Sequence, residues 1–397
     1  MSNLLNLDIK QQKNISNSFC EKVLQGLDKE GQELLCIPTY VSPIEGELNG
    51  AVTVVDFGGT NLRVAVVEFK KGVAVVTHGP VGKKLDPELG ETRSLEALFK
   101  AIAGLVNVLG YEEETPIGYC YSYPATSLKD GDAIGIGMSK DLAITELIGS
   151  KIGKPLLDYL NKNCKSKFSD IKVANDTITT LFAGKTLPGF DSYIGLIVGT
   201  GTNMATFFHT SRINKDIESW EGILPINLES GNFTPDVLTE LDKIVDDKSS
   251  NKGKQKFEKA VSGMFVGRLL NAAFPDKFDE HTDGKYMSYV IDNPKKFDTE
   301  AVELSQDAYK RSAKLVASTI AGLILSGNPP TDRTYRVLIV AEGSLFWSHL
   351  SEYKDYNKMV KKYLRDLLDH MHYSNVQFDI QRVENANLIG AAIVAMA

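Results

Sequence analysis

Apolar residues recur along the chain in two patterns, one with helical spacing and one of short continuous runs. Residues 11–30 carry apolar side chains every three or four positions, which predicts an amphipathic helix. Continuous apolar runs at 51–55 and 64–67 predict two strands. Because a short glycine-containing segment separates these runs, we expect the two strands to form a hairpin.

The same two patterns alternate through the rest of the chain. Further apolar runs predict strands at 73–76, 117–121, 192–198 and 335–340. Helical spacing predicts helices at 95–109, 177–183, 237–245, 257–273, 299–326, 357–372 and 388–397. This alternation predicts an α/β protein with two α/β segments, the first of which ends near Val173.

The composition is that of a soluble globular protein. The 397 residues suffice for two or three domains, and 43% hydrophobic with 24% charged residues are ordinary proportions. A formal net charge of −7 argues against a nucleic-acid surface, which needs a basic stripe. The N-terminus lacks the apolar core of a signal peptide, and no apolar run is long enough to span a membrane. With scattered cysteines, we expect a reduced, cytoplasmic setting and neither a membrane nor a nucleic-acid partner.

The residues between the first two predicted strands carry a strong chemical signal. Residues 56–63 read Asp-Phe-Gly-Gly-Thr-Asn-Leu-Arg. Adjacent glycines let successive backbone N–H groups approach an anion, and the threonine, asparagine and arginine side chains add donors. Asp56, at the end of a buried strand, needs a metal ion or hydrogen bonds to offset its desolvation. A phosphate with a divalent cation satisfies all of these groups, whereas an ordinary glycine turn is the structural alternative.

A second segment of the same kind follows the strand predicted at 192–198. It reads Gly-Thr-Gly-Thr-Asn at 199–203, so each α/β segment contains one strand–glycine–strand unit. Two such hairpins facing each other across a cleft would grip one polyphosphate from both sides, and a purely structural hairpin is again the alternative. The P-loop pattern fails, because Thr179 stands where Gly-Lys-Thr at 184–186 requires an earlier glycine.

A candidate general base lies between the two glycine segments. Asn175 and Asp176 join an apolar approach to a predicted helix start. Both residue types are favoured helix caps, which is the structural interpretation. As a base, Asp176 would accept a hydroxyl proton during phosphate transfer, while Asn175 would orient the same substrate. Glu229 and Glu258 are, by spacing alone, typical of exposed surface carboxylates.

Together and in this order, the motifs resemble those of the eukaryotic-type hexokinase and glucokinase family. The resemblance covers most of the chain, from Asp56 to the C-terminal helix, at spacing similar to that of the family. Besides 56–63, 175–177 and 195–203, its pieces are Ser-Tyr-Pro at 122–124, Ser-Lys at 139–140, Asn-Leu-Glu-Ser-Gly at 227–231, Phe-Glu-Lys-Ala-Val-Ser-Gly-Met-Phe at 257–265, Glu-Gly-Ser at 342–344 and Gly-Ala-Ala at 390–392.

The resemblance implies roles for individual residues. Asp176 matches the catalytic base for the sugar 6-hydroxyl, and Lys140 and Arg63 complete the catalytic group. The residues implied to bind the sugar are Ser122, Ser139, Lys140, Asn175, Asp176, Asn203, Glu229 and Glu258. Those implied to bind ATP are Gly58, Gly59, Thr60, Asn61 and Arg63 in the first hairpin, Gly199, Thr200 and Gly201 in the second, and Gly343 and Ser344 beside the adenosine. Asp56 would hold Mg²⁺ through water.

The resemblance also implies a two-domain actin-like ATPase fold, of the ribonuclease H-like class, with a cleft between the domains. The expected small domain comprises residues 51–174 and 382–397, and the large domain comprises residues 1–50 and 175–381. Water competes with the sugar as phosphate acceptor, so such a kinase must close around the sugar before phosphoryl transfer. Hinges are then expected where the chain crosses between the two domains.

The activity implied is ATP-dependent phosphorylation of a hexose at its 6-hydroxyl, with glucose as the first candidate and mannose or fructose as other acceptors. Around the expected sugar pocket the chain departs from the family pattern, at Tyr123, residues 138–142, Thr202 and Ser230. These departures leave an N-acetylhexosamine kinase as an alternative. A sugar sensor without turnover and an actin-like filament or chaperone ATPase are alternatives from other classes.

Overall fold

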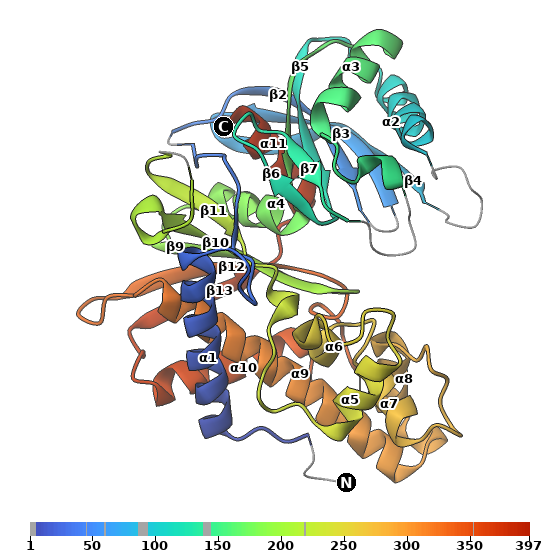
Figure 1. Cartoon of the computed structure of the whole chain (residues 1–397), viewed down its shortest axis with the longest axis vertical. Coiled ribbons are helices and arrows are strands. Elements are labelled where there is room, and N and C mark those ends of the chain that lie inside the picture. The colour runs from blue at the N-terminus through green and yellow to red at the C-terminus, as the bar shows by residue number, and fades with distance from the viewer. Residues whose placement is uncertain are drawn as a thin grey trace.

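The computed structural model is built on two β-sheets, with helices around and between them (Figure 1). It describes residues 5–44, 46–58, 61–85, 94–137, 144–217, 220–351 and 353–397. Strands and helices alternate along most of the chain, which confirms the predicted α/β class. Among the described residues, no helix combines the length and the apolar character that crossing a membrane requires.

The first sheet has the first predicted hairpin at its centre. Its order is β4-β3-β2-β5-β8, with β2 at Gly50–Phe57, β3 at Asn61–Lys70, β4 at Val73–Lys84, β5 at Thr115–Tyr121 and β8 at Phe168–Ala174. β2, β3 and β4 pair antiparallel, whereas β5 and β8 run parallel to β2. One face is covered by α2 (Leu95–Leu109) and α3 (Gly153–Asn163), and a small ribbon of β6 (Ala125–Ser127) and β7 (Ala133–Gly135) follows β5.

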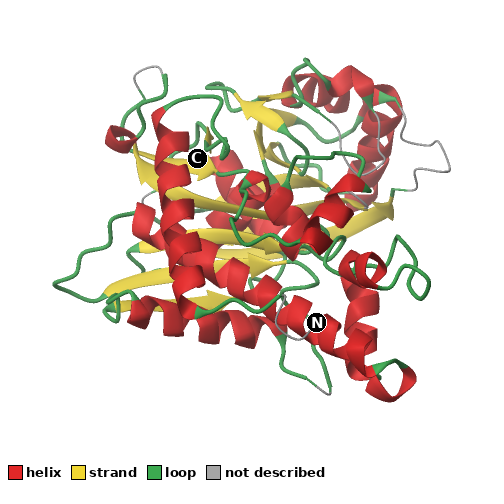
Figure 2. Cartoon of the chain, turned by 60° about the horizontal axis from the view of Figure 1, so that its bottom comes forward, coloured by secondary structure: helices red, strands yellow, loops and turns green. Residues whose placement is uncertain are grey.

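The second sheet contains the second predicted hairpin. Its order is β1-β11-β10-β9-β12-β13, with β1 at Ile37–Pro38, β9 at Ser192–Val198, β10 at Thr202–His209, β11 at Ile223–Asn227, β12 at Tyr335–Glu342 and β13 at Val376–Gln381. Three helices pack on one face, α1 (Ile9–Asp28), α9 (Thr299–Ser326) and α10 (Tyr356–His370). Figure 2 shows helices lying across the strands.

Alternation along the strands divides the interior into separate cores. Val337 and Ile339 of β12 face the core that contains α1, α9 and α10, whereas Leu338 between them faces the opposite core. Val54 of β2 in the first sheet belongs to that same opposite core. Two helices fill it, α4 (Asp176–Ala183) and α11 (Ala386–Met396), which lie between the two sheets (Figure 1).

The backbones of α4 and α11 are in direct contact, and the backbone of α11 also contacts that of the first sheet. A Cβ atom on Gly390 of α11 would lie 1.7 Å from the Thr179 carbonyl oxygen of α4. A Cβ atom on Gly118 of β5 would lie 2.2 Å from the Ala391 carbonyl oxygen. Contacts this short do not occur, so only glycine allows these approaches. The small residues at 390–392 therefore allow α11 to pack closely against α4 and β5.

The prediction of a single helix over 257–273 is wrong. The structure has two shorter helices there, and the helices of this part of the chain are α5 (Glu240–Asp247), α6 (Lys256–Val261), α7 (Arg268–Ala273) and α8 (Gly284–Asp292). In the break, the Gly263 N–H donates to the Gly199 carbonyl at 2.7 Å, and the Met264 N–H donates to the Thr200 carbonyl at 3.3 Å. Bonds to the second hairpin therefore replace helical bonds.

Candidate active site

Asp56 and Arg63 face each other across the first hairpin, where β2 pairs with β3. Arg63 Nε donates to Asp56 Oδ2 at 2.9 Å, and a terminal guanidinium nitrogen of Arg63 bonds the same oxygen. Asp56 is only 4% exposed, so this ion pair compensates a buried charge. Within the turn, the Gly58 N–H donates to the Asn61 carbonyl at 2.9 Å, which engages that amide in the hairpin itself.

The Asp56 carboxyl lies within electrostatic range of Asp176. Burial raises the pKa of Asp56 above its ordinary value, the Arg63 guanidinium and the Cys120 thiol lower it in part, and the charge of Asp176 raises it further. The pKa of the Cys120 thiol is raised well above its ordinary value, mainly by burial and then by the negative charges of Asp56 and Asp176. The residue predicted to hold a metal ion and the residue predicted to act as a base therefore influence each other electrostatically.

Asp176 is positioned by the junction between β8 and α4. Asn175 caps the helix, and its Oδ1 accepts the Thr177 N–H at 2.9 Å. Asp176 is the first residue of α4, and its Oδ1 accepts the Thr177 hydroxyl at 3.3 Å. The capping interpretation of Asn175 is thus confirmed. Because a helix N-terminus favours negative charge, an acidic residue suits this position in the first turn of α4.

A carboxylate from α6 holds the second hairpin. The Thr202 N–H donates to Glu258 Oε2 at 3.0 Å, and a Cβ atom on Gly201 would lie 2.5 Å from the same oxygen. Glu258 is half-buried. The expectation that Glu258 is an exposed surface carboxylate is therefore wrong. The sequence could not show this, because the residue whose N–H donates to Glu258 lies 56 positions away.

Asn203, Asn227 and Glu229 form a connected network beside this hairpin. Asn203 Nδ2 donates to Asn227 Oδ1 at 2.8 Å, and Asn227 Nδ2 donates to Glu229 Oε1 at 2.7 Å. The next residue, Ser230, donates its N–H to Asn203 Oδ1 at 3.1 Å. Glu229 is half-buried in this network, so the surface expectation is wrong for it as well. Asn227 is a central member that the sequence analysis did not single out.

The segment after β12 lies against the second hairpin at backbone distance. Gly343 has a φ of +112°, and a Cβ atom on it would lie 2.2 Å from the Val198 carbonyl oxygen. The Phe346 N–H donates to that same carbonyl at 2.9 Å. A Cβ atom on Gly199 would lie 3.1 Å from the Gly343 Cα and 3.5 Å from the Ser344 nitrogen. The structure thus brings the second hairpin together with both residues predicted to lie beside the adenosine.

An open cleft of about 630 Å³ adjoins this contact. Thr200 and Ser344 line it on the side of the second hairpin, and Gly263, Met264 and Gly284 line it farther along the chain. The Gly284 N–H donates to the Gly263 carbonyl at 2.6 Å, which joins the start of α8 to the break between α6 and α7. A cleft of this size beside a glycine hairpin suits a nucleoside.

A narrower pocket lies between the two sheets. Tyr121 and Tyr123 line it from the first sheet, Asn227 lines it from the second, and Asn175 lies at the junction. The Tyr123 hydroxyl donates to the Gly58 carbonyl at 3.4 Å. Tyr123, which the sequence analysis marked only as a departure from a family pattern, therefore connects this pocket to the first hairpin.

The remaining predicted site residues divide into two groups. Ser122 is buried, and its N–H donates to the Phe57 carbonyl at 3.1 Å, which places it directly beside the first hairpin. The others lie outside the described residues: Gly59, Thr60, Ser139 and Lys140.

Two family models, both described as Hexokinase, match the chain. One matches residues 1–186, and the other matches residues 193–310 and 302–397. The chain belongs to the hexokinase family. The resemblance drawn from the motifs is confirmed, and membership of this family makes the protein a hexose kinase, an enzyme that phosphorylates a sugar.

Individual hexokinases align over nearly the whole chain. Hexokinase-9 of Oryza sativa subsp. japonica is 26% identical, with 96% of this chain and 85% of that protein aligned. The hexokinase of Kluyveromyces lactis is also 26% identical, over 100% of this chain and 90% of its own. The structure of a Schistosoma mansoni hexokinase complexed with glucose matches with a TM-score of 0.81 at 22% identity, over 99% and 96% of the two chains. This likeness confirms the two-domain actin-like sugar kinase fold.

Replacing Gly343 with alanine should separate the segment after β12 from the second hairpin. The new Cβ would meet the Val198 carbonyl at 2.2 Å. We expect the free energy of unfolding to fall by at least about 2 kcal/mol in urea titrations, because strain and overpacking combine. Calorimetry should also show weaker ADP binding.

Gly222→Ala is the matched control for this substitution. Gly222 has a φ of +96°, but nothing lies within 4 Å of its Cβ position. It should therefore lose only about 1–2 kcal/mol through backbone strain and keep its ADP affinity. Equal effects of the two substitutions on ADP binding would contradict a specific role for the Gly343 contact.

Proposed function

We propose that the protein transfers the γ-phosphoryl group of ATP to the 6-hydroxyl of a hexose, with glucose as the first candidate, and releases ADP. The observation that carries this proposal is the position of Asp176, at the start of α4 and within electrostatic range of Asp56 on the first hairpin. A base that accepts the hydroxyl proton must lie beside the phosphate that this hydroxyl attacks.

In the proposed reaction, Asp176 accepts the proton of the 6-hydroxyl as that oxygen bonds the γ-phosphorus and the bond to ADP breaks. Phosphoryl transfer needs positioning and charge stabilisation more than covalent help. The two glycine hairpins, with Arg63 on the first, would hold the phosphates, and Gly343 with Ser344 would hold the adenosine. The contact of Gly199 with Gly343 supports this grouping.

The proposed sugar ligands are polar groups with fixed hydrogen bonds. Asn203 and Glu229 are joined through Asn227, and Glu258 is held by Thr202. Asn175 and Asn227 line the same narrow pocket. A site built from such groups discriminates strongly against a sugar that lacks a matching hydroxyl, since its buried polar atoms would then stay unpaired.

Magnesium would enter with the nucleotide. Among the described residues, no group of three or more His, Cys, Asp or Glu side chains could hold a metal ion. Mg²⁺ typically uses one or two carboxylates together with phosphate oxygens and water. Asp56 provides one buried carboxylate, whose charge Asp176 opposes, so a cation fits beside it. We therefore propose Mg²⁺–ATP as the donor, with Asp56 contacting the ion through water.

A sugar panel tests the activity. With Mg²⁺–ATP, glucose should stimulate ADP release and yield one hexose 6-phosphate per ADP, with mannose and fructose as slower acceptors. Faster turnover of N-acetylglucosamine or N-acetylmannosamine would favour the hexosamine alternative. Sugar binding without turnover would favour a sensor, and ATP hydrolysis indifferent to every sugar would contradict the kinase proposal.

Asp176→Ala should keep glucose binding but lose turnover. Removing a general base costs about 10²–10⁴-fold in rate, so kcat should fall by at least about 100-fold in the same coupled assay. Glucose affinity by calorimetry should stay within a few-fold. The control is Asp170→Ala, an exposed aspartate on β8. A variant at 176 with more than a tenth of the wild-type kcat would show that another group is the base.

Glucose should also close the two halves of the molecule. Ser122 follows β5 of the first sheet, whereas Asn203 lies in β10 and Glu229 follows β11 of the second sheet. A sugar bound to all three residues would therefore bridge the two sheets. Small-angle X-ray scattering should show a smaller radius of gyration with glucose. Asp176→Ala should close equally, and Glu229→Ala should not close at the same glucose concentration. An unchanged radius at saturating glucose would contradict closure.

A further inference from the structure

The cleft beside the second hairpin carries two cationic side chains that the proposed chemistry does not use. Arg268, the first residue of α7, and Lys285, in α8, line this cleft together with Thr200 and Ser344. Neither cation has a hydrogen bond or an ion pair within the part of the chain that the structure describes.

Arg268 is held in place by packing and not by polar partners. Its guanidinium carbon lies 4.6 Å from the centre of the Phe265 ring. Its Nε is buried and unpaired among the described residues, which is costly unless a ligand accepts from the guanidinium. Burial lowers the pKa of Arg268 and the charge of Glu280 raises it. An arginine nevertheless remains a cation with donors only.

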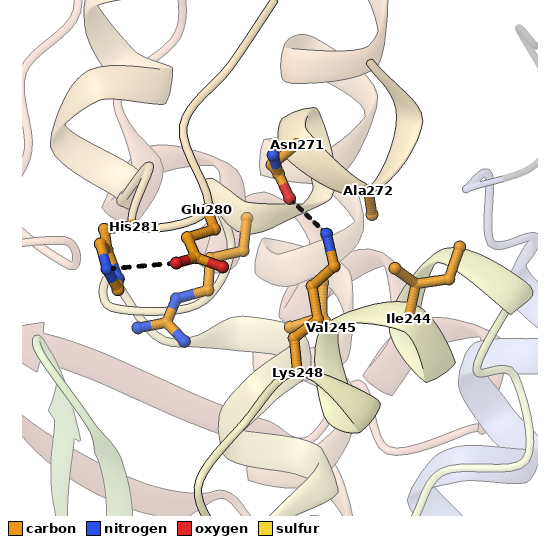
Figure 3. A pocket seen from close by; sticks show the side chains of 8 residues that line it. Ile244, Val245, Lys248, Asn271, Ala272, Glu280 and His281 are labelled. Carbon is orange, nitrogen blue, oxygen red and sulfur yellow. Dashed lines mark hydrogen bonds and ion pairs between the residues drawn. The ribbon is translucent and has the colours of Figure 1, made fainter. Parts of the chain in front are cut away.

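A second, smaller pocket adjoins the cleft. Arg268 also lines this small cavity. Figure 3 shows Glu280 and His281 on one side of this cavity, and the hydrogen-bonded side chains of Asn271 and Lys248 on the other. Asn271 Oδ1 accepts from Lys248 Nζ at 2.8 Å, and His281 Nε2 lies 3.7 Å from a Glu280 oxygen. Arg268 and His281 line both this cavity and the cleft, and only the cleft is large enough for a nucleotide, so the cleft is the side from which such a ligand can reach Arg268.

Other polar side chains of the cleft are already engaged. Asp283 accepts the Tyr286 N–H at 2.8 Å as the cap of α8, and the Ser288 hydroxyl donates to the Gly284 carbonyl at 2.8 Å. The Ser348 hydroxyl donates to the Leu345 carbonyl at 2.7 Å. The two histidines of the cleft, His281 and His349, contact Glu280 and Asp355. Among the charged side chains that line the cleft, this leaves Arg268 and Lys285, which only donate. The far part of the cleft therefore favours a ligand edge made of acceptors.

Arg268 lines the cleft but is not among the residues that bond the second hairpin, which suits the base of a nucleotide better than its phosphates. The Met264 N–H bonds the Thr200 carbonyl at the hairpin. From there the chain runs along the cleft and reaches Arg268 at the start of α7. A nucleotide with its phosphates at Thr200 would thus extend its base toward Arg268.

We propose that Arg268 contacts the base of the donor nucleotide and selects 6-oxopurines, guanine or hypoxanthine, over adenine. Guanine and hypoxanthine present two acceptors, O6 and N7, to the forked donors of an arginine, whereas adenine presents N7 beside an amino donor. The inference rests on the proposed function, because it specifies the donor of that reaction. GTP and ITP should therefore be used at least as efficiently as ATP.

The test compares kcat/KM for GTP, ITP and ATP with glucose as acceptor. In the wild type the GTP-to-ATP and ITP-to-ATP ratios should be one or more, and in Arg268→Met both should fall by about tenfold or more. Arg268→Lys keeps the charge but loses the fork, so it should behave like Arg268→Met. Arg333→Met removes an exposed arginine that does not line this cleft and should leave both ratios unchanged. Thermal melting confirms that each variant is folded.

Calorimetric binding of GDP and ADP gives the same ratio without turnover. If no sugar is phosphorylated but Arg268→Met still lowers the GDP-to-ADP affinity ratio, the proposed function fails and the base contact stands. Ratios that Arg268→Met leaves unchanged would overturn the inference. The inference would also be overturned if the protein used inorganic polyphosphate as phosphoryl donor and Arg268→Met abolished this activity. Arg268 would then bind additional phosphate groups and not a nucleotide base.

Discussion

The rest of the structure depends on the central pair α4 and α11, which contacts both sheets through backbone atoms. Gly390 lets α11 lie on Thr179 of α4, Gly118 lets the first sheet reach α11, and Gly195 of the second sheet would place a Cβ 2.5 Å from the Thr177 carbonyl of α4. Backbone contacts leave no side chain to reorient, so the closure expected on glucose binding would turn about this pair without separating α4 from its neighbours. Asp176 therefore keeps a fixed position beside the hairpin that carries Asp56.

A second set of close contacts assembles the other half of the site. The second hairpin is held on one side by Gly343 and on the other by Glu258 and the Gly263 amide. The break between α6 and α7 exists because this amide bonds the hairpin instead of its own helix. The same break directs the chain along the cleft to Arg268. One local departure from helical structure thus connects the proposed phosphate site with the proposed base site.

The sequence predicted those helices and strands whose formation depends on interactions between residues close together in the chain. The helix over 95–109 and the strand over 192–198 have the predicted bounds, because their periodicity and their caps lie within the segment itself. The hairpins were predictable for the same reason. Glu258 was not, because a carboxylate whose partner is a backbone amide 56 positions away looks like any surface carboxylate in the sequence. Asn227 was missed likewise, since only the folded sheet places it between Asn203 and Glu229.

The two charged residues of the first hairpin, Asp56 and Arg63, depend on each other electrostatically. Arg63 is the counter-charge of Asp56, whose ionised form is opposed by burial and by Asp176. If Arg63 turned toward a phosphate, Asp56 would lose that counter-charge in a buried place. A divalent cation that arrives with the nucleotide would replace it. On the proposed function, Mg²⁺ would supply the counter-charge that the Asp56 carboxylate needs, and Arg63 would then be available to bind the phosphates.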